Sequence, residues 1–132
     1  MKEGPTNRKK PFDLEERTYE FSLGVRLFLK QRNWHQVNWC DVNQLLRSSG
    51  SVAANYIESQ EALGGNDFIY RIRLCRKESR ESSLWLRLLE DTTDLSTDQT
   101  TTLQALLSET NELVRIFTTI IKKREARTKS SK

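Results

Sequence analysis

The amino-acid sequence predicts an all-α protein, an up-down-up-down antiparallel four-helix bundle. In four separate stretches, apolar residues recur at alternating steps of three and four, the spacing that brings them to one face of a helix. The connections between these stretches are short and polar, so consecutive helices are expected to lie side by side and antiparallel. No stretch shows the strict apolar–polar alternation that is typical of a half-buried strand.

The first helix is expected from Leu14 to about Gln31. Asp13 can cap its N-terminus, and Glu16, three residues later, completes a pattern that resembles a capping box. The predicted buried stripe consists of Leu14, Thr18, Phe21, Val25 and Phe28. Leucines 23, 27 and 29 make the apolar surface wider than this one stripe, which favours self-association because monomers rarely expose large apolar patches.

The second helix is expected from Trp39 to about Leu63, after a break over residues 33–38. Its predicted buried stripe consists of Val42, Leu45, Ser49, Val52, Tyr56 and Ser59. The middle of this helix is rich in Ser, Gly and Ala, and Gly50 there costs about 1 kcal/mol relative to alanine. A continuous helix then requires a close approach by a neighbour or a local bend, and the alternative is a turn over residues 48–51. The apolar phase persists across this segment, which favours the continuous helix.

The third helix is expected from Asp67 to Asp91 and the fourth from about Asp98 to Arg124. The third has the buried stripe Phe68, Ile72, Cys75, Ser79, Ser82, Leu86 and Leu89, and a second apolar patch at Leu84, Trp85 and Leu88. The fourth has the buried stripe Leu103, Leu106, Thr110, Leu113, Phe117 and Ile120. We therefore expect a bundle over residues 12–124, a disordered basic tail over 1–11 and another over 125–132.

The positive charge is concentrated at the two ends of the chain. Residues 1–10 hold four basic side chains against one acidic, and residues 122–132 hold six against one. The intervening residues 11–121 hold 12 basic and 16 acidic side chains, within a total net charge of +4. Basic tails often contact nucleic acid, although they can also merely solvate frayed ends.

The chemistry-bearing residues point to a protein that is not an enzyme. The single histidine, His35, falls in a predicted loop, which excludes Glu-x-x-His metal pairs and histidine-based nucleophile arrangements. Cys40 and Cys75 do not form a CxxC pair, and Gly64–Gly65 lacks the lysine of a phosphate-binding loop. We expect no catalytic residue, metal or cofactor. Without a signal peptide or a membrane-spanning run, a cytoplasmic location with two free thiols is expected.

One polar group stands out on the facing surfaces of helices two and three. Arg47, Asn55 and Glu58 lie on the second helix, and Glu78 and Glu81 lie midway along the third. If the two helices are antiparallel neighbours, these residues can form a partly buried network that fixes the helix register, since buried charge persists only when it is paired. The alternative is a set of ordinary surface pairs, each worth less than about 1 kcal/mol.

Five segments resemble a known bacterial family. They are residues 12–18 (FDLEERT), 44–56 (QLLRSSGSVAANY), 67–69 (DFI), 77–82 (KESRES) and 85–86 (WL). Together they are similar to the four-helix-bundle proteins encoded within intervening sequences of 23S ribosomal RNA genes. The resemblance spans about residues 12–123 and implies an up-down bundle that assembles into a homopentamer. It also links the chain to the accessory proteins of diversity-generating retroelements, which engage a reverse transcriptase and nucleic acid.

Two functional interpretations follow. The first is a homo-oligomer that associates with RNA or nucleoprotein through basic residues near the ends and along helix three, namely Lys9, Lys10, Lys122, Lys123, Arg124, Arg73, Arg76, Arg80 and Arg87. Three of the helix-three arginines recur every seven residues and share a face. The second is a protein–protein scaffold or accessory subunit that does not itself bind nucleic acid.

Overall fold

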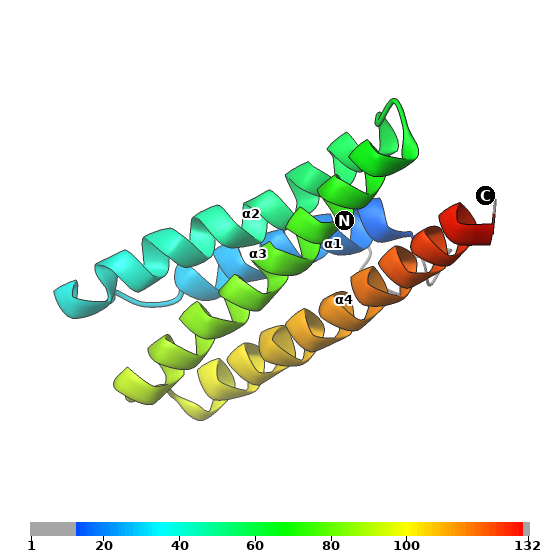
Figure 1. The fold of residues 1–132 in the computed structure, drawn as a ribbon. Coiled ribbons are helices and arrows are strands. Elements are labelled where there is room, and N and C mark those ends of the chain that lie inside the picture. Colours follow the sequence, from blue (N-terminus) through cyan, green and yellow to red (C-terminus); the bar gives the residue numbers. More distant parts are fainter. Residues whose placement is uncertain (1–12, 131–132) are drawn as a thin grey trace, which may run out of the picture.

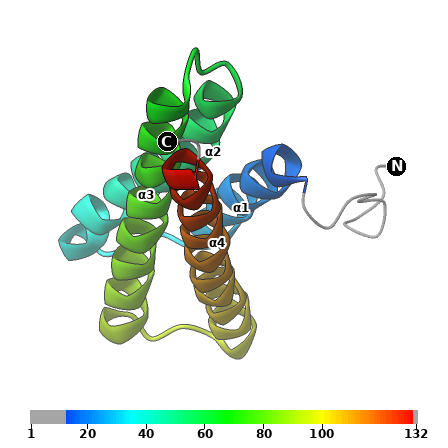
Figure 2. The ribbon, with the colours of Figure 1, turned by 45° about the vertical axis from the view of Figure 1, so that its right-hand side comes forward.

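Over residues 13–130 the fold consists of four α-helices, each antiparallel to the one before it in the chain, which confirms the predicted all-α class. The computed structural model describes residues 13–130 of the chain. The elements are α1 (Leu14–Leu29), the short 3-10 helix η2 (Gln36–Asn38), α2 (Trp39–Gln60), α3 (Gly65–Thr92) and α4 (Thr97–Ser130). Each helix runs back along its predecessor (Figure 1), with α2 and α3 packed along their lengths and α4 against α3. Figure 2 shows α1 inclined to α4.

The ends of α1 are set by specific side chains. Asp13 caps the helix, since its Oδ1 accepts a hydrogen bond from the backbone N–H of Glu16 at 3.2 Å, as the sequence predicted. The helix ends at Leu29, slightly earlier than expected, because Trp34 folds back and its Nε1 donates to the Leu29 carbonyl at 3.0 Å. The ring of Trp34 also packs on Phe28, with the centroids 5.7 Å apart.

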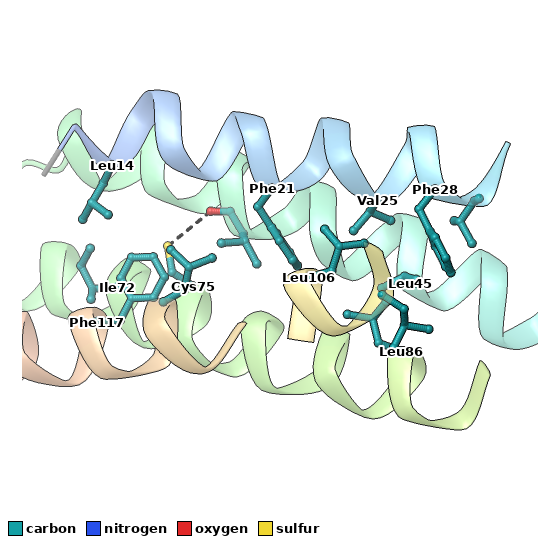
Figure 3. Close-up of a cluster of buried hydrophobic side chains, with 14 of the residues drawn as sticks. Leu14, Phe21, Val25, Phe28, Leu45, Ile72, Cys75, Leu86, Leu106 and Phe117 are labelled. Carbon is teal, nitrogen blue, oxygen red and sulfur yellow. Dashed lines mark hydrogen bonds between the residues drawn. The ribbon is translucent and has the colours of Figure 1, made fainter. Parts of the chain in front are cut away.

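The core lies along the bundle axis and consists of the predicted stripes. All five stripe residues of α1 are buried, and on the other helices every stripe residue is buried or half-buried. Figure 3 shows Phe21, Val25 and Phe28 of α1 pointing toward the same interior as Leu45 and Leu86. The buried hydroxyls are satisfied locally: Thr18 Oγ1 donates to the Leu14 carbonyl at 2.7 Å, and the Ser48 and Ser82 hydroxyls bond each other at 2.8 Å.

Helix α2 is continuous through its small-residue segment, so the alternative of a turn over residues 48–51 is wrong. Arg26 of α1 lies across this segment and makes the close approach. Its Nη2 donates to the Leu46 carbonyl at 3.2 Å, and its Nη1 donates to Ser49 Oγ at 3.3 Å. A Cβ atom at position 50 would lie 3.1 Å from Arg26 Nη2, so glycine provides the space that the guanidinium occupies.

Helix α4 extends to Ser130, beyond the predicted end at Arg124, so the disordered tail expected over residues 125–132 is helical through residue 130. The extension is held against α3 by an ion pair between Arg73 and Glu125. Thr128 Oγ1 also donates back to the Arg124 carbonyl at 3.0 Å. The predicted N-terminal tail, residues 1–11, lies outside the described residues. Within residues 13–130, no helix has the length and apolar character needed to cross a membrane.

Candidate nucleic-acid interface

Three parts of the chain meet at one end of the bundle because an even number of antiparallel helices returns the chain to where it began. The start of α1, the α2–α3 connection and the last turns of α4 all lie at this end (Figure 1). Leu14 of α1 lines a groove together with Ile120 and Lys123 of α4. Residues 59–65 lie beside Arg124. The start of α1 and the last turns of α4, which carry basic residues, therefore lie at the same end of the molecule.

The last turns of α4 bring several cations to this end. We call the set Lys122, Lys123, Arg124, Arg127 and Lys129 the basic end; a single acidic residue, Glu125, interrupts it. The three lysines are exposed, and their amines are free to approach a phosphate. Arg124 is more restricted, because its guanidinium stacks 4.1 Å from the centroid of the Phe68 ring.

Arg127 and Lys129, which fall in the C-terminal tail predicted from the sequence, were not among the predicted contacts. The signal that could have placed them is the alternation of polar and charged helix formers after Lys123, which contains no glycine or proline to end the helix. Lys9 and Lys10, which were included, lie outside the described residues. The exposed acidic residues at this end belong to elements other than α4. Glu58 lies on α2, Glu61 in the α2–α3 connection and Asp67 on α3, while Asp13 and Glu15 lie at the start of α1.

The arginines of α3 do not form one uniform surface. Arg73, Arg80 and Arg87 are exposed on the same outward face, as their spacing of seven predicts. Arg73 is paired with Glu125 of α4, whereas within residues 13–130 no carboxylate forms an ion pair with Arg80 or Arg87. Arg76 is half-buried and turns toward α4, where its Nη1 donates to Thr118 Oγ1 at 3.3 Å.

Arg47, Glu78 and Glu81 are joined across α2 and α3. Arg47 Nη2 lies 3.1 Å from Glu78 Oε1 and 2.9 Å from Glu81 Oε1, and Nη1 donates to Glu78 Oε2 at 3.4 Å. The Glu78 side chain is only 8% exposed, while that of Arg47 is 49% exposed. The hydrogen bonds that Arg47 donates to Glu78, then the charges of both carboxylates, raise the pKa of Arg47 above its ordinary value.

The other two residues of the predicted network lie elsewhere. Asn55 Oδ1 accepts from Arg71 Nη1 at 3.2 Å, and its amide donates to Ser51, so it belongs to a separate group that includes an arginine which sequence reasoning missed. Glu58 is exposed, and within residues 13–130 no bond joins it to Arg47 or Asn55. The distance along the helix explains the separation: Asn55 lies more than two turns from Arg47, too far along α2 to share a carboxylate with it.

An apolar groove of about 460 Å³ lies between the start of α1, the end of α2 and α4. Its lining includes Leu14, Tyr56, Ile116 and Ile120, with Lys123 at its rim. Burial, followed by the negative charges of Asp13 and other acidic groups, raises the pKa of the Tyr56 phenol. The phenol therefore stays protonated and is available as a hydrogen-bond donor throughout the physiological range.

The titratable groups do not form a reactive set among residues 13–130. Burial raises the pKa of the Cys75 thiol to about 12, and Cys75 Sγ donates to the Val52 carbonyl at 3.5 Å (Figure 3), so this thiol is a poor nucleophile. His35 is exposed in the first connection, and its Nδ1 accepts from the backbone N–H of Val37. The described part of the chain contains no group of three His, Cys, Asp or Glu side chains that could hold a metal ion.

Comparison with known proteins agrees with this architecture. A solved structure from Bacteroides thetaiotaomicron, a protein of unknown function from the S23 ribosomal protein family, is similar with a TM-score of 0.69. Its sequence is 26% identical, and the match covers 83% of this chain and 98% of that one. No curated protein matches the sequence. The family model for the 23S rRNA-intervening sequence protein matches residues 13–116, which comprise all of α1, α2 and α3 and more than half of α4. The chain therefore belongs to the 23S rRNA-intervening sequence protein family.

Proposed function

We propose that this protein is a cytoplasmic, non-enzymatic homo-oligomer, pentameric by the resemblance described above, that associates with RNA or nucleoprotein. The observation that supports this most is the basic end. The last turns of α4 present three exposed lysines, and α1, which the basic residues 1–10 precede in the sequence, begins at the same end. The family description, which names a 23S rRNA intervening sequence, is consistent with an RNA partner.

Contacts of this kind are electrostatic and tolerant of sequence. Each lysine that neutralises a phosphate releases a counterion, so binding weakens as salt rises. The acidic balance of residues 11–121 repels the rest of the polyanion, which confines binding to the end where the cations gather. We therefore expect one oriented contact rather than a coat over the whole surface.

The test is a titration of a fluorescent structured RNA at several salt concentrations. A Lys122→Gln/Lys123→Gln/Lys129→Gln variant should bind more weakly, and its slope of log K against log salt should be less negative by roughly two to three. A Lys30→Gln variant serves as the control, because Lys30 is exposed where α1 ends, at the opposite end of the bundle. If the triple variant and the control bind alike, the basic end is not the contact.

The second candidate function is a protein–protein scaffold or an accessory subunit of the reverse-transcriptase type. The exposed apolar residues Tyr19, Leu27, Leu84 and Leu88 favour it, since they offer contact area that a polyanion does not use. Under this function, wild-type protein at low salt leaves the RNA unbound, and the oligomer instead retains a protein partner that is released by substitution of the apolar residues.

A further inference from the structure

The outward face of α1 is apolar and acidic. Tyr19 and Leu27 are 49% and 54% exposed, and Leu23 lies midway between them on the same face at steps of four residues. Glu15 and Glu16 precede them by steps of three or four, so the carboxylates continue this face toward the helix N-terminus. A helix with apolar residues on both its inner and outer sides is one that is normally covered on both sides.

The outward face of α3 is apolar and basic. Tyr70, Leu84 and Leu88 are exposed there by 56%, 46% and 37%. The same face carries the exposed side chains Arg73, Lys77, Arg80 and Arg87. Arg80 and Arg87 flank Leu84 by one turn on either side, and neither forms an ion pair within residues 13–130. Positive charge at these sites therefore remains uncompensated by the bundle that holds it.

These two faces point in different directions. Both α1 and α3 pack against α2 and α4, so they occupy diagonal positions in the bundle. Figures 1 and 2 show α1 and α3 on opposite sides of the molecule. The α1 face of one molecule can therefore meet an α3 face only on a second molecule. Such a head-to-tail contact generates a ring when the rotation closes.

We infer that the α1 face of one copy of this chain docks on the α3 face of the next. This inference rests on the proposed self-association and specifies its surfaces. The complementarity is twofold: leucine and tyrosine lie on both faces, and the carboxylates of Glu15 and Glu16 are opposite in sign to Arg80 and Arg87. It assigns the unpaired arginines of α3 to assembly, and leaves the basic end for RNA.

Apolar content favours a second copy over RNA as the occupant of the α3 face. Three large apolar side chains share this face with the cations, an arrangement typical of protein interfaces, where aromatic residues and arginine are enriched. A phosphate backbone would pair with the arginines but would leave Leu84 and Leu88 in water. The α1 face supplies carboxylates for these arginines and apolar area that can cover Leu84 and Leu88.

Sedimentation or native mass measurement of charge-reversed variants tests the inference. Arg80→Glu/Arg87→Glu should shift the protein from its oligomeric mass toward the 15.5 kDa monomer, with association weakened at least about tenfold. Glu15→Lys/Glu16→Lys should do the same. The chain that combines all four substitutions restores opposite charges at every contact and should recover the oligomer. Arg115→Glu/Lys122→Glu, two reversals on α4, is the matched control and should leave the mass unchanged.

An apolar pair of variants keeps the test independent of charge. Leu84→Asp should reduce the mass, whereas Leu63→Asp should not, because Leu63 is 99% exposed in the α2–α3 connection and belongs to neither face. Circular dichroism checks that each variant remains helical.

The outcomes separate this inference from the proposed function. A wild-type protein that is monomeric at all concentrations overturns the proposed self-association and the inference with it. A wild-type oligomer whose mass is unaffected by the α3 reversal overturns the inference alone. Failure of the four-substitution chain to reassemble also overturns it. In that case the arginines of α3 would not pair with the carboxylates of α1, as in a contact between the α3 faces of two copies, which would not respond to changes in α1. If the α3 reversal lowers RNA affinity but not the mass, the arginines contact RNA instead.

Discussion

Removal of the Arg47 guanidinium tests whether the α2–α3 ion-pair group is a partly buried network or a set of surface pairs. In Arg47→Met the carboxylate of Glu78, only 8% exposed, loses partners at 3.1 and 3.4 Å. Its nearest remaining cation is Lys77, with Nζ 4.0 Å away. A hydrogen bond to a charged group contributes about 1.5–3 kcal/mol. Because Arg47 is 49% exposed, we expect a loss at or slightly below the lower limit of that range, about 1–1.5 kcal/mol.

Glu81→Gln is the matched comparison, because Glu81 binds the same guanidinium at 2.9 Å but is 34% exposed. Its loss should cost less than about 1 kcal/mol. Urea unfolding at neutral pH measures both free energies, and Arg47→Met/Glu78→Leu, which removes the charge together with its partner, should recover most of the loss. Equal small losses for Arg47→Met and Glu81→Gln, or a double variant no better than the single, would refute the network.

Three other predictions follow from buried groups. Gly50→Ala should change the free energy of unfolding little in the wild type, because the gain of about 1 kcal/mol in helix propensity is offset by displacement of Arg26. In an Arg26→Ala background the same substitution should stabilise the protein by about 1 kcal/mol, as measured by urea unfolding. The pKa of the Cys75 thiol is raised from 9.0 to about 12, so the thiol ionises at lower pH in the unfolded chain than in the folded one. The free energy of unfolding should therefore fall by about 1.4 kcal/mol per pH unit between pH 9 and about 12. In Cys75→Ala this part of the pH dependence should be absent. Alkylation followed by mass spectrometry should modify exposed Cys40 in the native protein and Cys75 only after denaturation; rapid native labelling of Cys75 would contradict its burial.

The helices and their buried faces could be predicted because they depend on local pattern. The three-and-four spacing of apolar residues fixed which side of each helix faces the core, and Asp13 marked the start of α1. The close approach of a neighbouring group to α2 at Gly50 could also be anticipated from the sequence. The identity of the approaching group could not, because Arg26 reaches α2 through packing between helices, which leaves no periodic trace in the sequence.

The polar group and the basic end were predictable only in part, for related reasons. The contact of Arg47 with the two glutamates could be predicted, because α2 and α3 were expected to pack antiparallel and these side chains are long enough to meet. Asn55 pairs instead with Arg71, since the choice among several arginines on α3 depends on the helix register. The extension of α4 depends on its contacts with α3, such as the ion pair between Arg73 and Glu125, whereas composition alone is equally typical of a disordered tail.

The return of the chain to its starting end has a consequence for affinity. Residues 1–12 are attached at Asp13, beside the last turns of α4, and twelve residues reach at most roughly 40 Å when fully extended. Under the proposed function, when the lysines of α4 hold a phosphate backbone, the covalent link through Asp13 would keep the basic side chains of residues 1–10 near it at an effective concentration on the order of millimolar. Two individually weak contacts would then act as one bivalent contact, with a combined affinity above that of either segment. A rigid insertion between residues 1–10 and α1 would remove this gain.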